Sequence, residues 1–141
     1  MERVRVLLAE DHPAVAQRLR DMLATEFDVI GTVSNGQDLI AAVQRLQPDV
    51  VVTDIGMPVL DGLQAAQILL KEDPRRRVVI ISVYEDQALI KRAGEIGVRG
   101  YVTKASGCAN LIAAVHEAWD TGNSRAAPDN SGPTKKKGAQ T

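Results

Sequence analysis

The chain has 141 residues, of which 45% are hydrophobic and 25% charged, and its formal net charge is -1. This length fits one domain with a core of ordinary size, and the composition is that of a globular protein. The balanced charge argues against a dedicated nucleic-acid-binding domain, which would carry a strong basic excess. One cysteine excludes an internal disulfide, and Glu10 and Asp11 interrupt the first apolar run, unlike a signal peptide. We therefore expect a cytoplasmic protein without a membrane-spanning segment.

Short apolar runs typical of buried strands alternate with segments of helical spacing. In chain order, the expected strands are residues 4–9, 28–34, 49–54, 77–83 and 100–103. The third and fourth are the strongest, because near-continuous β-branched residues are typical of parallel strands covered on both faces.

The segments between and after these strands predict five helices. The first begins at Pro13, a residue tolerated in the first helical turn, and the second ends before Pro48. The third ends at Asp73, the fourth before Gly97 and the fifth at Gly122. Five successive β-α units imply right-handed crossovers and an open, doubly wound α/β sheet. Residues 123–141 are rich in Gly, Pro and Ser and include three adjacent lysines, which predicts a disordered tail or linker after a folded domain of residues 1–122.

Polar side chains follow the strands at one predicted edge of the sheet. Reactive groups in open α/β sheets lie beyond the carboxyl ends of the strands. The first strand ends in Glu10 and Asp11, the third in Asp54, and the fourth and fifth near Ser82 and Lys104. One edge should therefore gather three carboxylates, a hydroxyl and an ammonium.

This combination of groups indicates phosphoryl chemistry. Three neighbouring carboxylates repel one another, and a hard divalent cation, Mg²⁺ first, would relieve the repulsion and attract phosphate. Lys104 would offset anionic charge, Ser82 would donate a hydrogen bond, and Asp54 could act as the nucleophile that forms an aspartyl phosphate. Each residue alone is better explained as a helix cap or loop charge. Their recurrence at one edge favours a site.

Four segments resemble the receiver domain of bacterial two-component response regulators: "LLAEDHP", "VVTDIGMPVLDG", "VVIISV" and "GYVTKA". The resemblance runs from Val4 to about Gly122, and it implies a flavodoxin-like (βα)5 fold with strand order 2-1-3-4-5. It also assigns the site residues. It implies that Asp54 is the phosphoacceptor, that Glu10, Asp11, Asp54 and the Gly56 carbonyl form the Mg²⁺ side, and that Ser82, Tyr101 and Lys104 are the switch and phosphate-binding residues.

"DHPAV" and "GVRGYVTKAS" look most like the NarL/FixJ subfamily, whose members usually carry a LuxR-type helix-turn-helix after the receiver. No such domain follows Gly122, so we expect either a stand-alone receiver or the input half of a transcription factor. Ala105 stands where many receivers have a proline after a cis bond, which leaves the Lys104–Ala105 geometry open. Gly56 and Tyr84 occupy positions that tune water access in this family, so the lifetime of the phosphoryl group is open too.

The resemblance implies a switch whose output is binding rather than catalysis. A sensor histidine kinase or phosphotransfer protein would phosphorylate Asp54, a homodimer could form, and neither membrane nor nucleic acid would be bound by this chain itself. The alternatives are a phosphorylation-independent scaffold or phosphate sink, an aspartyl-phosphate hydrolase and a flavin carrier. The hydrolase would need a second aspartate where Gly56 stands, and the flavin carrier a phosphate-binding loop where the chain has acidic "EDHPAV".

Several polar residues are left outside the predicted site. The pattern at His12 favours a surface residue that opens the first helix over a metal ligand. His116 is expected on the exposed face of the last helix, and Cys108 at its start. The three arginines at positions 75–77 are expected to form a solvated loop, and the lysines at 135–137 a solvated tail.

Overall fold

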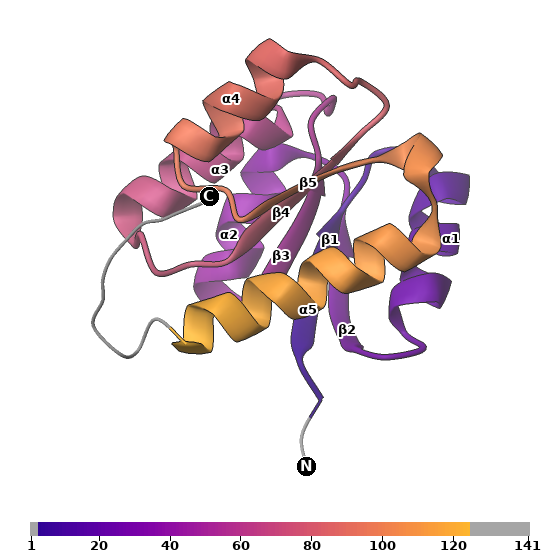
Figure 1. The fold of residues 1–141 in the computed structure, drawn as a ribbon. Coiled ribbons are helices and arrows are strands. Elements are labelled where there is room, and N and C mark those ends of the chain that lie inside the picture. Colours follow the sequence, from indigo (N-terminus) through magenta and orange to yellow (C-terminus); the bar gives the residue numbers. More distant parts are fainter. Residues whose placement is uncertain (1–2, 125–141) are drawn as a thin grey trace.

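The fold is a five-stranded parallel sheet of order β2-β1-β3-β4-β5 with helices on both faces, as the sequence predicts (Figure 1). The computed structural model describes residues 3–124. The elements in chain order are β1 (Arg5–Ala9), α1 (Pro13–Leu23), β2 (Asp28–Val33), α2 (Gly36–Leu46), β3 (Val50–Asp54), α3 (Gly62–Glu72), β4 (Val78–Ser82), α4 (Gln87–Glu95), β5 (Gly100–Thr103), a short 3-10 helix η1 (Lys104–Ser106) and α5 (Cys108–Ser124).

The predicted strand bounds hold to within one residue. β5 matches its prediction, whereas each of the other strands is shorter by one residue at one or both ends, because the hydrogen-bonded ladder starts later or stops earlier than the apolar run. Helix α5 continues to Ser124, two residues beyond the predicted end at Gly122. The predicted tail from residue 125 onward lies outside the described residues.

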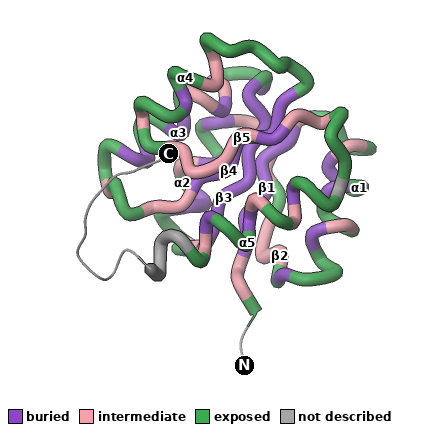
Figure 2. Tube along the Cα trace, viewed as in Figure 1, coloured by how far each residue is buried: buried purple, intermediate pink, exposed green. Residues whose placement is uncertain are grey.

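Alternate residues of the strands feed two separate cores. Val6 and Leu8 of β1 pack on one face with α1 and α5, through residues such as Leu19 and Val115. Leu7 and Ala9 face the opposite side, where α2 and α3 cover them. All five residues of β3 and all five of β4 are buried, which confirms the prediction of strands covered on both faces (Figure 2).

The amino edge of the sheet is lined by arginines that bind the ends of helices. The Arg3 guanidinium donates to the carbonyl of Ala24 after α1, and Arg5 donates to the carbonyls of Leu46 and Gln47 at the end of α2. A guanidinium there satisfies carbonyls that have no partner within the helix and complements the negative end of the helix dipole.

The prediction of a solvated loop at the three consecutive arginines is wrong for two of them. Arg75 is exposed and pairs with Asp73. Arg76 is half-buried, donates to the carbonyl of Leu69 near the end of α3 and pairs with Glu72. Arg77 lies 4.4 Å above the Trp119 ring of α5. These two side chains join the loop to helices, because their long apolar stems can be covered while the charged head finds a partner.

Gly62 allows α3 to begin in direct contact with the end of β3. A Cβ atom at Gly62 would lie 1.8 Å from the backbone oxygen of Asp54 and 2.9 Å from the hydroxyl of Thr53. The Gly62 amide donates to the carbonyl of Ile55 at 2.8 Å, which holds the two segments together. No side chain fits in this space.

We predict that Gly62→Ala lowers the free energy of unfolding by about 2–3 kcal/mol, because the methyl group forces backbone apart in a packed region. Gly94→Ala is the matched control: it lies in α4, and a Cβ there meets nothing within 4 Å. That variant should be more stable than the parent by about 0.5–1 kcal/mol, since alanine favours the helix. Urea denaturation measures both. A Gly62→Ala protein as stable as the parent would contradict the close packing.

Candidate functional site

The predicted site residues meet at the carboxyl edge of the sheet, where β3 lies between β1 and β4. Ala9 of β1 pairs with Thr53, and Ile81 of β4 pairs with Asp54. Asp54 therefore ends the central strand, with Glu10 following β1 on one side and Ser82 ending β4 on the other. The topology predicted from the sequence positions the acids together.

Glu10, Asp54 and Lys104 form a buried charge cluster. The carboxylates of Glu10 and Asp54 have only 0% and 9% of their side-chain surface exposed. The Lys104 ammonium, in η1 after β5, donates to Glu10 Oε1 at 2.9 Å and to Asp54 Oδ2 at 3.4 Å. One cation thus lies between two buried anions, 94 and 50 residues away in sequence.

The cluster shifts the pKa of each of its members. Burial raises the pKa of Asp54, and the negative charge of Glu10 raises it further, while Lys104 offsets part of the effect. Burial also acts to raise the pKa of Glu10, but hydrogen bonds from Lys104 and His12 outweigh it, so this pKa is lowered. Burial acts to lower the pKa of Lys104, yet the two carboxylates raise it overall. Of the two buried carboxylates, Asp54 is therefore the less compensated.

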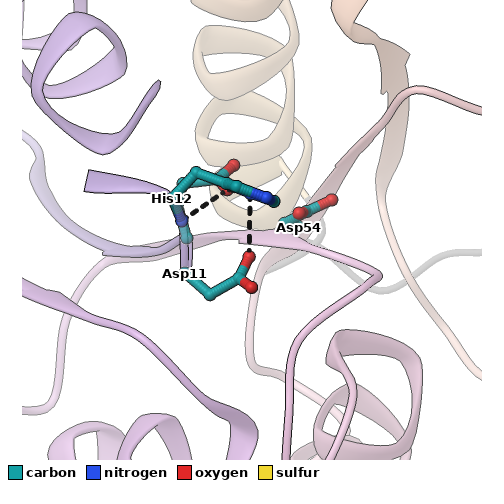
Figure 3. Close-up of side chains that lie close together, drawn as sticks. Asp11, His12 and Asp54 are labelled. Atoms are coloured by element: carbon teal, nitrogen blue, oxygen red, sulfur yellow. Dashed lines mark hydrogen bonds and ion pairs between the residues drawn. The ribbon is translucent and has the colours of Figure 1, made fainter. Parts of the chain in front are cut away.

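Asp11 and His12 complete the acidic side of the site. Asp11 Oδ1 is buried and makes no hydrogen bond, and the His12 ring nitrogen Nδ1 lies 3.2 Å from it. The same nitrogen lies 3.1 Å from Glu10 Oε2, and these acids raise the pKa of His12. Potential ligand atoms of Glu10, Asp11, His12 and Asp54 all lie within 4.8 Å of one another. Figure 3 shows the Asp11 carboxylate facing the His12 ring, which extends toward Asp54.

The other side of the site carries Ser82 and the two tyrosines. Ser82 is buried, and its hydroxyl oxygen accepts a hydrogen bond from the Tyr84 amide at 3.0 Å. The Tyr101 hydroxyl donates to the Tyr84 carbonyl at 2.9 Å. Tyr84 thus links Ser82 to Tyr101 through its backbone, while its own side chain is exposed.

Two residues after Asp54, the loop from β3 to α3 has no side chain at Gly56. Gly56 is exposed, and a Cβ atom there would meet nothing within 4 Å. Val59 is 77% exposed and has a φ of 70°, a left-handed conformation that β-branched residues rarely adopt. The described residues contain no cis peptide bond, so the Lys104–Ala105 bond is trans.

Sequence reasoning missed three contributors to the site. Thr53 resembled an ordinary strand residue, yet its buried hydroxyl donates to the backbone oxygen of Asp54 at 2.9 Å. Gly62 and His12 also contact this region. The only signal for His12 in the sequence was its position next to the acids. The contacts of Thr53 and Gly62 depend on packing between elements, which no local pattern reveals.

Comparison with known proteins identifies the family. Residues 6–116 match the response regulator receiver domain. The chain belongs to this family. The receiver is similar to response regulator GacA of Pseudomonas aeruginosa, with 32% identity over 118 residues, and to transcriptional regulatory protein LnrK of Bacillus subtilis, with 32% identity over 114 residues. These matches cover 82% and 79% of the chain but 55% and 52% of the relatives, so the chain spans about half their length.

Solved structures support the same assignment. The receiver is similar to the signal receiver domain of the response regulator NarL from Mycobacterium tuberculosis, with a TM-score of 0.79 and 28% identity over 89% of this chain and all of that one. It is also similar to a LuxR-family response regulator from Aurantimonas, with a TM-score of 0.82 and 26% identity over 85% of this chain and 87% of that one. The chain is a NarL/FixJ-type receiver of the two-component response regulators, and several of its relatives are transcriptional regulators.

Within residues 3–124, no helix combines the length and the apolar composition that crossing a membrane requires.

We predict that Asp54→Asn stabilises the receiver at neutral pH in the presence of a chelator. The raised pKa of Asp54 means that its charged form costs stability at every pH above the ordinary carboxyl value. The gain should be complete above the pKa of folded Asp54 and should shrink as the pH falls from that pKa toward the ordinary aspartate value. Below the ordinary value it should vanish, because both the folded and the unfolded states are then protonated. Urea denaturation at several pH values measures this.

Asp86→Asn is the control for this measurement, because Asp86 is exposed and caps α4, a role that asparagine can keep. Its stability should follow that of the parent at all pH values. An Asp54→Asn protein that is less stable than the parent at neutral pH would show that the charge of Asp54 is well compensated.

Proposed function

We propose that the receiver is phosphorylated on Asp54 by a partner histidine kinase or phosphotransfer protein. The observation that carries the proposal is the buried Asp54 carboxylate at the tip of the central strand, 3.4 Å from the Lys104 ammonium and beside the acids that follow β1. No other aspartate among residues 3–124 is buried. A nucleophile with incompletely compensated charge and a neighbouring cation suits transfer of an anionic group.

The proposed reaction moves a phosphoryl group from a phosphohistidine to the receiver. An oxygen of the Asp54 carboxylate attacks the phosphorus atom, the phosphorus–nitrogen bond breaks, and the leaving imidazole nitrogen takes up a proton. An acyl phosphate forms on Asp54. Lys104 would pair with a phosphoryl oxygen, since its ammonium already lies beside Asp54 Oδ2, and Ser82 would donate its hydroxyl to another.

The acidic side chains fit a hard divalent ion. Glu10, Asp11 and Asp54 offer carboxylate oxygens within one small space, and Asp11 Oδ1 is buried without a hydrogen bond. We propose Mg²⁺ as the ion, with Asp11 and Asp54 as direct ligands, Glu10 in support, and the backbone carbonyl of Gly56 as a further ligand. Bound there, it would neutralise negative charge on the phosphoryl oxygens.

The proposed output is a change of binding surface. When the Ser82 hydroxyl turns toward a phosphoryl group, the Tyr84 amide loses its acceptor, and the backbone that holds the Tyr101 hydroxyl is free to shift. The face formed by α4, β5 and α5 would then exchange one set of partners for another, a shift between two populated states. Catalysis would be confined to the receiver's own phosphorylation and dephosphorylation.

The names of the relatives support a proposal about the wider protein. EvgA is named as a DNA-binding transcriptional activator, and LnrK as a transcriptional regulatory protein. We propose that this receiver acts in the cytoplasm as the input of a transcription regulator, with a helix-turn-helix domain outside the present chain, and that phosphorylation favours a homodimer.

We predict that acetyl phosphate with Mg²⁺ adds one phosphoryl group to the parent, measured by intact mass spectrometry. Asp54→Asn should remain unmodified, because an amide oxygen is a poor nucleophile and forms no acyl phosphate. A chelator should prevent the reaction in the parent as well. Asp86→Asn, which lies on the neighbouring β4–α4 loop, should be phosphorylated like the parent. Modification of Asp54→Asn to the parent's extent would refute the assignment of the phosphoacceptor.

A further inference from the structure

The proposed function leaves His12 without a role, although its ring borders the acidic pocket. Its Nδ1 atom lies 3.1 Å from Glu10 Oε2 and 3.2 Å from Asp11 Oδ1. The ring extends toward the Asp54 carboxylate (Figure 3), and its potential ligand atom lies within 4.8 Å of those of all three acids. The pocket therefore offers a nitrogen donor in addition to oxygens.

Neither helix capping nor core packing accounts for the position of this ring. His12 is the N-cap residue of α1, but its side chain makes no capping hydrogen bond, whereas Ser, Thr, Asp or Asn would cap the helix. The side chain is 67% exposed, so little apolar surface is buried by its orientation. What the ring does contact is the pair of carboxylates.

The distances suit two ligands of one metal ion. Ligands at about 2.1 Å from an ion lie about 3.0 Å apart at a right angle and about 3.4 Å apart in a tetrahedron. The 3.2 Å separation of His12 Nδ1 and Asp11 Oδ1 falls within this range. Asp11 Oδ1 is buried and has no hydrogen bond, so its lone pairs are available. A hydrogen bond between ring and acid has the same length, so a binding experiment must separate the two.

Glu10 holds His12 in place through its backbone as well as its ring, and an ion bound to Nδ1 would replace only the ring's hydrogen bond to Oε2. Glu10 Oε1 accepts a hydrogen bond from Lys104, and Oε2 accepts one from the backbone amide of His12 at 3.2 Å. Both contacts remain if Nδ1 turns to an ion. The donor set then comprises His12, Asp11 and Asp54, one nitrogen and two carboxylates.

We propose that His12 ligates a divalent transition-metal ion together with Asp11 and Asp54, so that the pocket binds such an ion more tightly than Mg²⁺. Imidazole suits Co²⁺, Ni²⁺ and Zn²⁺, whereas Mg²⁺ prefers oxygen ligands, and affinities rise along the first transition row toward copper. The inference rests on the proposed function of the acidic pocket and extends it by naming a second class of ion. A transition ion would thus compete with Mg²⁺ for the site.

The test is calorimetric titration of the parent, His12→Asn and His116→Asn with Ni²⁺ and, separately, Mg²⁺. The pH is kept mildly alkaline so that the imidazoles are neutral. His12→Asn should bind Ni²⁺ at least about tenfold more weakly than the parent, while its Mg²⁺ affinity stays within about twofold because the oxygens are unchanged. His116→Asn is the matched control: His116 is exposed on α5 and pairs with Glu26, and it should bind both ions as the parent does.

A second measurement reports the bond itself. With Co²⁺ bound, the parent should show a strongly shifted proton resonance from a coordinated imidazole, and His12→Asn should lack it. The His12→Asn protein should fold, since the ring is exposed and asparagine is a favourable N-cap; urea denaturation checks this.

The outcomes separate this inference from the proposed function. Equal Ni²⁺ affinity in His12→Asn and the parent would overturn the inference, as would an equal loss for Ni²⁺ and Mg²⁺, because His12 would then only orient the acids. Either result leaves phosphorylation of Asp54 intact. If Asp54 were not phosphorylated but His12→Asn still lost Ni²⁺ selectively, the proposed function would fail and the metal site would stand.

Discussion

Two buried carboxylates share one ammonium at the carboxyl edge of the sheet, and this imbalance underlies the chemistry that we propose. Burial and the charge of Glu10 raise the pKa of Asp54, whereas hydrogen bonds from Lys104, which lies closer to Glu10, and from His12 lower the pKa of Glu10 in spite of its burial. The negative charge of Asp54 is therefore only partly compensated. A divalent ion would compensate the remainder, and Lys104 would stay beside Asp54 to bind an anionic group. The backbone holds the Asp54 carboxylate in a fixed position, because β3 is buried along its whole length and Gly62 packs directly against its end.

The two edges of the sheet lie at opposite ends of the helix dipoles. Helices of a parallel α/β fold begin near the carboxyl edge and end near the amino edge, so their dipoles point the same way. At the amino edge, Arg3, Arg5 and Arg76 bind the carbonyls that end α1, α2 and α3. At the carboxyl edge, the positive ends of the helices surround the acids. Guanidinium groups thus bind helix ends at the amino edge, whereas a cluster of buried acids lies at the carboxyl edge.

Much of this arrangement could be predicted from the sequence, because it depends on local patterns and on chain topology. Continuous β-branched runs predicted β3 and β4, and the rule that strand ends gather ligands brought Glu10, Asp54 and Lys104 together. The family resemblance was confirmed by the comparisons, whereas the individual roles of the site residues stay predictions. Side-chain partners were harder to foresee: Arg76 and Arg77 resembled a solvated loop, and the bond from Thr53 to the Asp54 backbone required the folded geometry. The sequence favoured a surface residue that opens the first helix at His12, and only the folded structure gives its distances to the acids.

The central claim is that Asp54 is the less compensated of the two buried carboxylates, and carboxyl-carbon NMR measures this directly. The side-chain carbons of Glu10 and Asp54 would be followed through a pH titration without divalent ions and again with Mg²⁺. We expect the pKa of Asp54 to lie above the ordinary aspartate value without the ion, that of Glu10 to lie below the ordinary glutamate value, and added Mg²⁺ to lower the pKa of Asp54. An Asp54 pKa at or below the ordinary value, unchanged by Mg²⁺, would contradict the account.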